Sequence, residues 1–225
     1  MNIYPLGTCA SANSSGTIDS ISYSMFEPNL RCKSSPIFTI LNTRWDNQTM
    51  QTRQKAEPYL SITYEYENIY DKEYKQIEHF IYSVAQGGVV SFHVVDFSAG
   101  VKPTSVTNSS GDWIVAIPNT RLYSAQANRK AANAFLWNGK DYKEGDIVTV
   151  TANTSIKVDV DTNNYGNLSL ANANSYAWVY PLYEVYVAEN ALSQFNTTVN
   201  IDEENGIYAG YMRSGSIGFF TRYKV

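Results

Sequence analysis

The fold is decided by the stretch Pro58-Tyr59-Leu60-Ser61-Ile62-Thr63-Tyr64-Glu65-Tyr66-Glu67, in which apolar and polar residues alternate. The polar residues fall on one side of an extended chain, and the other side carries Leu60, Ile62, Tyr64 and Tyr66. Successive side chains of a β-strand point to opposite faces of its sheet. The alternation therefore predicts a strand with one buried face.

An amphipathic helix is predicted directly after this strand, over residues 71–86. Its apolar residues recur at i, i+3, i+4 and i+7 and form one stripe: Ile77, Phe80, Ile81 and Val84. Asp71 is predicted to cap the first turn, and Gly87-Gly88 is predicted to end the helix in the left-handed conformation. A second strand, rich in β-branched and aromatic residues, is expected at residues 89–97.

Short strands are predicted on both sides of this central unit. Alternating or β-branched runs occur at residues 21–26, 36–41, 113–117, 134–137, 147–150, 154–160, 175–187, 199–201, 207–212 and 217–223. Asn138-Gly139 is typical of a hairpin turn. Pro181 predicts an edge strand or a bend at 175–187, and the Ala-rich run 125–134 suggests two or three helical turns. Many short strands joined by turn residues indicate a mainly β protein, with a sandwich or barrel in its second half.

Composition and charge exclude some partners. The 225 residues carry a net charge of −4 and contain no basic block, so sequence-specific nucleic-acid binding is not expected. No segment approaches the roughly 18 apolar residues of a membrane span, and the first residues do not resemble a signal peptide. Cys9 and Cys32 could form one disulfide bond, but two cysteines in a chain of this length favour free thiols.

The surface is expected to be polar but weakly charged. Charged residues make up 17% of the chain, and it contains 18 tyrosines, whereas charged residues are about 25% of a typical soluble domain. Tyrosine is favoured where proteins contact one another. The alternative is that the tyrosines pair across many strands inside the fold.

No catalytic, cofactor-binding or metal-binding residue is predicted, and the chain is not expected to be an enzyme. His79 and His93 are the only histidines, and no nucleophile motif accompanies either of them. The run Asp159–Gly166 resembles the start of an EF-hand loop, but its sixth and twelfth positions are Asn164 and Leu170. An EF-hand needs Gly and a bidentate acid there, so a β-turn is the simpler interpretation and a shallow Ca²⁺ site is the alternative.

The order of signals from Ile37 to Phe97 resembles a known family. A strand leads into Arg44-Trp45, a polar stretch follows, and then come the alternating strand, the helix with Phe80, Gly87-Gly88 and a strand that bears Phe92. This order is similar to that of the minor tail and distal tail proteins of long-tailed bacteriophages and gene transfer agents. The chain departs from the family pattern at Asn47-Gln48-Thr49, where several members carry a Gly-rich turn, and the part after Gly100 has no residue-by-residue match.

The resemblance implies a tail-tube-like β-sandwich with a flanking helix at residues 21–100. A second β domain, sandwich or barrel, is expected at 101–225, and a flexible N-terminal arm at 1–20. The family implies a structural virion protein, a subunit of a homo-oligomeric ring with three- or six-fold symmetry at the distal end of a phage tail. Its implied partners are the tail tube and tail-tip or hub proteins, without a membrane and without a cofactor, and its assembly would take place in the cytoplasm of the bacterial host.

Two alternatives remain open at this point. The first is a neck protein, such as a tail terminator, stopper or head–tail connector, because those positions use related β-sandwich rings. The second is a carbohydrate-binding β domain. Its mark would be exposed aromatic rings gathered on one face or rim, and the candidate rings are Trp113, Trp137, Trp178 and Tyr180.

Overall fold

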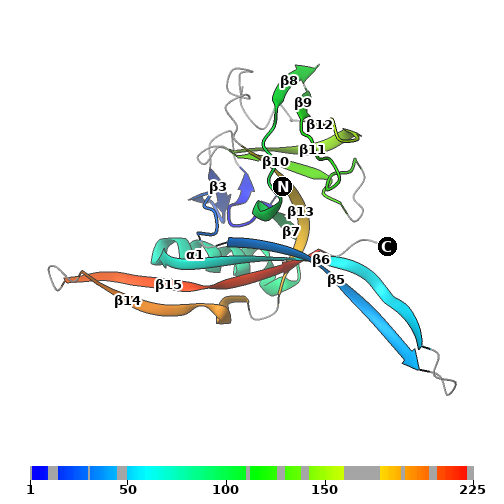
Figure 1. Ribbon diagram of the computed structural model, residues 1–225. Helices are drawn as coiled ribbons and strands as arrows, with labels where there is room; N and C mark the ends of the chain where they lie inside the picture. The colour runs from blue at the N-terminus through cyan, green and yellow to red at the C-terminus, as the bar shows by residue number, and fades with distance from the viewer. Residues whose placement is uncertain are drawn as a thin grey trace.

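The computed structural model describes residues 2–9, 15–29, 31–44, 50–109, 112–125, 130–137, 142–159, 178–188, 191–202 and 207–221 (Figure 1). Its strands are β1 (Asn2–Ile3), β2 (Gly7–Cys9), β3 (Ser15–Ile18), β4 (Ile21–Ser24), β5 (Arg31–Arg44), β6 (Met50–Tyr70), β7 (Phe92–Val95), β8 (Ser105–Ser109), β9 (Asp112–Ala116), β10 (Asn133–Trp137), β11 (Tyr142–Thr151), β12 (Ser155–Asp159), β13 (Trp178–Val187), β14 (Asn196–Asp202) and β15 (Ile207–Phe220). Its helical segments are α1 (Asp71–His79), the π-helical turn η1 (Phe80–Val84) that continues it, and the short 3-10 segments η2 (Gln86–Gly88), η3 (Phe97–Ala99) and η4 (Ala191–Gln194). The predicted class, mainly β with one flanking helix, is confirmed.

The strands form a larger and a smaller sheet that meet at β13. The larger sheet has the order β4-β3-β2-β1-β7-β13-β10-β11-β12-β9-β8, and the smaller sheet has the order β14-β15-β6-β5. At its end β13 passes from one sheet to the other, since Tyr186 and Val187 pair with Phe220 and Phe219 of β15. The helix lies against the smaller sheet, along β15 and β6 (Figure 1).

Strand pairing crosses the expected domain boundary near residue 100. From the second half of the chain, β13 pairs with β7, and β15 pairs with β6 along most of its length. One hydrophobic core runs through both halves and includes Phe80 and Phe219. The two expected units therefore share one continuous set of paired strands.

The central unit is built as its sequence predicts. Ile62, Tyr64 and Tyr66 of β6 are buried, and the polar residues between them are only partly covered. The helix stripe is also confirmed, because Ile77, Phe80 and Ile81 are buried and Val84 packs against them. Gly87 and Gly88 adopt φ values of 67° and 102°, so the left-handed helix end is confirmed as well.

Two details of this unit differ from the prediction. Asp71 does not cap the helix but is its first residue, and the preceding backbone N–H, of Tyr70, donates instead to Glu73 Oε2 at 2.9 Å. The second strand begins at Phe92 rather than Val89, because the chain is still turning after η2 and leaves the Val89 side chain in solvent.

Residues 1–20 are not a flexible arm in the parts that the structure describes. They form β1, β2 and β3, and Ile3, Tyr4 and Leu6 are fully buried. The Tyr4 ring lies at the centre of an aromatic cluster, with ring centroids 5.2 Å from Phe80 and 4.9 Å from Phe219. The segment was predicted to be flexible because of its Ser, Gly and Ala content, but the short apolar run at residues 3–6 packs in the core.

Two further predictions need correction. The suggested helical turns at 125–134 give way, where described, to strand β10, which starts at Asn133; residues 126–129 lie outside the described part of the chain. Pro181 marks neither an edge nor a bend, because β13 lies between β7 and β10. Pro181 C=O accepts from Asp96 N–H at 2.9 Å, just beyond the end of β7, so a residue with an N–H at position 181 would donate to Asp96 C=O. Asp96 C=O accepts instead from Ala99 N–H at 3.1 Å, so the proline leaves this acceptor satisfied.

Two hairpins extend from the smaller sheet in opposite directions. The β14–β15 hairpin projects on the side of the helix start, and the β5–β6 hairpin projects on the other side (Figure 1). The predicted turn at 138–139 falls on residues outside the described part, but the hairpin pairings of β10 with β11 and of β14 with β15 are formed.

Candidate functional site

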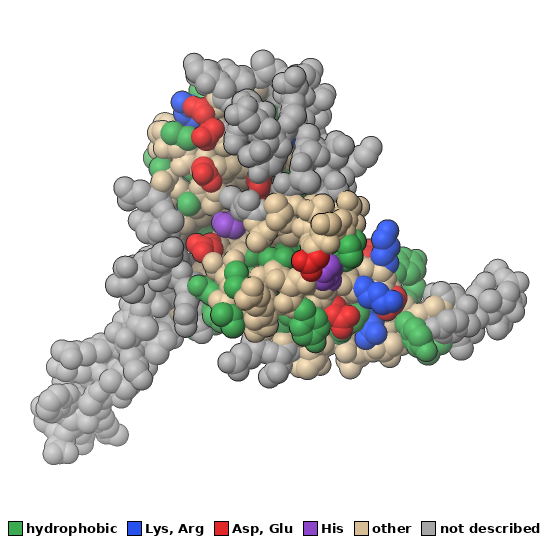
Figure 2. All heavy atoms as spheres, turned by 180° about the vertical axis from the view of Figure 1, so that it is seen from behind, with side chains coloured by type: hydrophobic (Ala, Val, Ile, Leu, Met, Phe, Trp, Pro, Cys, Tyr) green, Lys and Arg blue, Asp and Glu red, His purple; other side chains and the backbone are tan. Residues whose placement is uncertain are grey.

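The surface carries few charges, and several of them form ion pairs. Figure 2 shows a mostly uncharged face on which basic side chains gather near the base of one projecting hairpin. In that region Asp71 lies 2.7 Å from Lys75 and 4.0 Å from Arg213. The Arg213 guanidinium also stacks over the Tyr74 ring at 3.9 Å. Such pairs stabilise a surface locally and do not form a basic patch for a polyanion.

His79 is the centre of a polar cluster between the helix and the β3–β4 turn. Its Nδ1 lies 2.7 Å from Tyr23 Oη, and its Nε2 lies 2.8 Å from Asp19 Oδ2. Ser83 Oγ donates to the same carboxylate oxygen at 2.7 Å. Asp19 occupies a two-residue turn in which it and Ser20 have φ values of 48° and 68°, as a tight hairpin requires.

The arrangement of this cluster suits a structural link. The hydrogen bond from Ser83, and then that from His79, lower the pKa of Asp19, while burial and the nearby Asp19 charge raise the pKa of Tyr23. His79 Nδ1 therefore accepts from a protonated phenol when Nε2–H donates to the carboxylate. In a catalytic triad the serine hydroxyl donates to the histidine; here Ser83 donates to Asp19 instead, so Ser83 does not take the place of that serine.

The second histidine lies within the larger sheet. His93 pairs with Glu184 across β7 and β13, and Ser91 Oγ donates to Glu184 Oε1 at 2.7 Å. Burial lowers the pKa of His93, and the Glu184 charge only partly opposes this effect. The two histidines sit in separate polar clusters and do not share a site.

A buried carboxylate holds the thiol of Cys32. Asp96 is buried and accepts from Ser98 N–H at 3.1 Å and Ser98 Oγ at 2.5 Å, and the Cys32 thiol lies 3.7 Å from it. Burial, and then the Asp96 charge, raise the pKa of Cys32 to about 12. The predicted free thiol is confirmed for Cys32; the side chain of Cys9 lies outside the described part of the structure.

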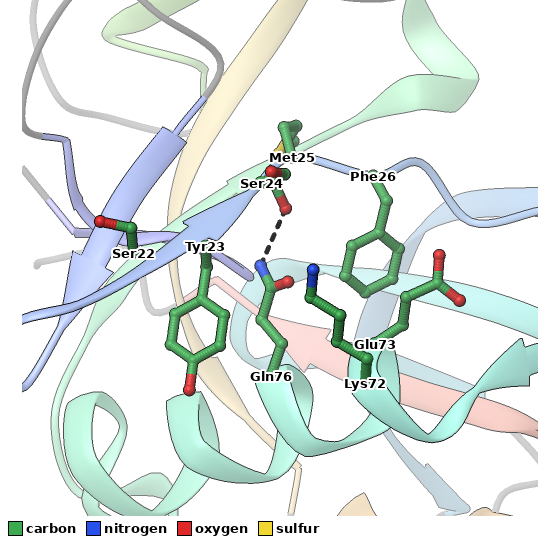
Figure 3. Close-up of a pocket in the computed structure, with 8 residues that line it drawn as sticks. All are labelled: Ser22, Tyr23, Ser24, Met25, Phe26, Lys72, Glu73 and Gln76. Atoms are coloured by element: carbon green, nitrogen blue, oxygen red, sulfur yellow. Dashed lines mark hydrogen bonds between the residues drawn. The ribbon is translucent and has the colours of Figure 1, made fainter.

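A cavity of about 210 Å³ opens between strand β4 with its continuation and the first turns of the helix (Figure 3). The five consecutive residues from Ser22 to Phe26 line one wall, and Lys72, Glu73 and Gln76 line the other. The Tyr23 ring that borders the cavity is the one whose hydroxyl meets His79. Sequence analysis missed this site, because its residues come from two segments about 50 positions apart and only Gln76, a polar residue beside the apolar stripe, stands out.

The aromatic residues considered for a carbohydrate platform are mostly in the core. Trp113, Trp137 and Tyr180 are buried, and Trp178 alone among the four is exposed, at 43%. The Trp137 indole N–H donates to Glu27. These four rings therefore do not gather on one exposed face.

The described residues include no group of three or more His, Cys, Asp or Glu side chains placed to share a metal ion. The Ca²⁺ alternative at Asp159–Gly166 falls almost wholly on residues outside the described part, which resumes at Trp178. Within the described chain, no helix has the length and apolar composition needed to cross a membrane.

The two outer strands of the smaller sheet, β5 and β14, differ in the residues that could block pairing at their open edges. The backbone polar groups of Leu60 face Thr221. Leu60 N–H donates to Thr221 Oγ1 and Leu60 C=O accepts from Thr221 N–H, each at 2.9 Å. Pro36 lies opposite Leu60, so the backbone of Pro36 points to the open edge of β5, where it offers no donor. Arg31 and Lys33, on the same edge strand, bind Glu65. At the other edge, β14 has the sequence NTTVNID with neither Pro nor Lys.

Comparisons with known proteins add no relative: the sequence matches no protein-family model, and no curated protein matches it either.

Proposed function

We propose that this protein is a structural subunit of a bacteriophage tail, one that joins copies of itself into a ring at the distal end of the tail tube. The observation that carries the proposal is the difference between the two edges of the smaller sheet. Pro36 and the charged pair Arg31 and Lys33 protect the inner part of β5, whereas β14 keeps an open edge. Proteins usually protect edge strands against pairing with another chain, so an unprotected edge suits a partner strand.

The two hairpins allow this pairing to repeat from one copy of the chain to the next. They project from opposite sides of the body (Figure 1), so the β14 edge of one copy can lie along the neighbour's β5 beyond Pro36. Such a contact joins two different surfaces and repeats from copy to copy, which closes a ring when the rotation allows it. The weakly charged, tyrosine-rich composition agrees with extensive contacts between proteins.

The neck of the tail is the closest alternative position, because the same two edges would serve a ring there. Carbohydrate binding through Trp113, Trp137 and Tyr180 is less favoured, since those rings are buried. The distal position follows from the resemblance between Ile37 and Phe97 and is part of the proposal.

The test measures mass in solution, by light scattering after size exclusion, together with negative-stain imaging. The wild-type chain is expected to form three- or six-fold rings. Val199→Lys, which places a charge on the exposed β14 strand, is expected to give monomers. The matched control is Val148→Lys, at a similarly exposed valine on β11 of the larger sheet, away from both edges of the proposed contact.

Rings that persist in Val199→Lys, or rings lost equally in both variants, would contradict the role of β14. A wild-type chain that stays monomeric at every concentration, alone and with purified tail tube protein, would contradict the ring itself. Far-ultraviolet circular dichroism of all three proteins separates a loss of assembly from a loss of fold.

A further inference from the structure

The cavity between β4 and the helix contains a fixed hydrogen-bond acceptor. Gln76 is buried, at 4% exposure, and its amide nitrogen donates to Ser24 O at 2.9 Å and Pro5 O at 3.0 Å. Both amide hydrogens are thereby used, which fixes the orientation of the side chain. Its oxygen points to the side of the cavity where Lys72 lies (Figure 3).

The charges at the cavity balance one another. Lys72 supplies a cation and Glu73 a carboxylate, and both line the same wall as Gln76. Glu73 already accepts from Tyr70 N–H through Oε2. A net-neutral wall with donors and acceptors favours a neutral ligand that both donates and accepts hydrogen bonds, and it does not favour an anion.

Two aromatic rings at the cavity, Tyr23 and Phe26, are fixed by contacts with residues that do not line it. The Tyr23 hydroxyl binds His79, and the Phe26 ring packs on Tyr66 with centroids 5.8 Å apart. Rings fixed before binding lose little conformational entropy when a ligand packs on them.

The opposite wall adds backbone groups. Ile18 and Ile21 close the two-residue turn between β3 and β4. Ladder bonds alternate along such a hairpin, so the backbone polar groups of Ser22 and Ser24 point away from β3. The bond from Gln76 to Ser24 O agrees with this direction.

We propose that this cavity binds a single sugar ring, either free or at the end of a glycan. Its volume is about 210 Å³, which equals about seven waters at roughly 30 Å³ each and is smaller than the pockets of about 300 Å³ or more that hold drug-sized ligands. A pyranose offers several hydroxyl groups that both donate and accept, and an apolar C–H face that packs on an aromatic ring. The Gln76 oxygen and the Lys72 ammonium bind the hydroxyl groups, and Phe26 packs against the ring face. This inference does not depend on ring assembly.

The test uses the full chain and the methyl glycosides of glucose, galactose, mannose and N-acetylglucosamine, with saturation-transfer NMR to detect binding and titration to measure it. At least one glycoside is expected to bind. Lys72→Met is expected to weaken that binding about tenfold or more, as loss of a charged hydrogen-bond donor does. Lys75→Met is the matched control, because Lys75 does not line the cavity and pairs with Asp71; it is expected to bind like the wild type.

Three results would overturn the proposal. The first is that no glycoside binds and a glycan array is also negative. The second is that the two lysine variants bind the glycoside equally well. The third is that a peptide with acidic side chains binds the cavity in a Lys72-dependent manner while the glycosides do not, since the site would then recognise a carboxylate.

Discussion

The ring of Tyr4 stands edge-on against the ring of Phe80, with centroids 5.2 Å apart and planes at 87°. One ring comes from the fourth residue of the chain and the other from the helix, and both are fully buried. The start of the chain therefore completes the core around the helix. Edge-to-face pairs of this kind stabilise a core by about 0.5–1.5 kcal/mol beyond the area they bury.

Phe80→Asp is expected to abolish cooperative unfolding. Truncation of a buried phenylalanine costs about 3–5 kcal/mol, and a buried, unpaired carboxylate adds to that cost. Tyr82→Asp is the matched control, because this ring lies two residues away with 65% exposure, and it is expected to change the free energy of unfolding by less than about 0.5 kcal/mol. Urea titration followed by circular dichroism measures both; an unchanged transition in Phe80→Asp would mean that the helix face is not core.

Gly7→Ala tests whether the N-terminal segment is part of the fold. Gly7 has φ +80°, and an added Cβ would lie 2.4 Å from Thr17 O and 2.5 Å from Ile18 Cγ1. Gly87 has φ +67° and nothing within 4 Å of such a Cβ. Gly87→Ala is therefore expected to lower the free energy of unfolding only by the strain of the left-handed conformation, about 1–2 kcal/mol. Gly7→Ala is expected to lower the melting temperature clearly more than Gly87→Ala does. A free N-terminal arm would give no change in Gly7→Ala.

His93 is expected to make the folded state less stable in mild acid. Burial lowers its pKa in the folded protein, so below about pH 6.5, the ordinary value, the unfolded chain binds a proton that the folded chain does not. The contribution of the uncharged His93 to the free energy of unfolding is therefore fully present above that pH, and it falls as the pH drops below it. The free energy of unfolding, measured at pH 8 and pH 5.5, is expected to fall less in His93→Gln than in the wild type. Equal pH dependence in both proteins would refute this assignment.

The Cys32 thiol is expected to react slowly with iodoacetamide in the folded protein. Its pKa is raised to about 12 by burial and by Asp96, so little thiolate exists at pH 8. Asp96→Asn removes the carboxylate charge and is expected to speed alkylation in the native state. Peptide mass spectrometry reports Cys32 separately from Cys9, and guanidinium-unfolded protein gives the reference rate. Rapid labelling of wild-type Cys32 without denaturant would contradict the buried thiol.

The sequence predicted best where a local pattern and the tertiary environment agree. The alternation in residues 58–67 and the stripe from Ile77 to Val84 each repeat with the period of their element, so the buried faces were readable. Its errors fell where a local signal competes with packing. Pro181 signals an edge strand, yet its missing N–H falls at the end of β7.

The candidate sites could be predicted far less well than the elements. The polar cluster joins Asp19 and Tyr23 to His79 and Ser83, which lie 56 to 64 positions further along the chain. The cavity similarly joins β4 to the helix start. Such contacts are set by how the elements pack, and no periodicity within one segment encodes them.

The sequence by itself determined that this protein is mainly β, that one amphipathic helix follows the strand at 58–67, and that its surface is weakly charged. These properties depend on side-chain period and composition, which are local. Tertiary structure alone decided that Tyr4 fills the centre of the core, that β13 connects both sheets, and that β14 keeps an open edge while Pro36 lies on the protected one. Pairing between distant strands depends on the free energy of the whole packed arrangement, and a short apolar run such as residues 3–6 acquires its place only when the other strands form around it.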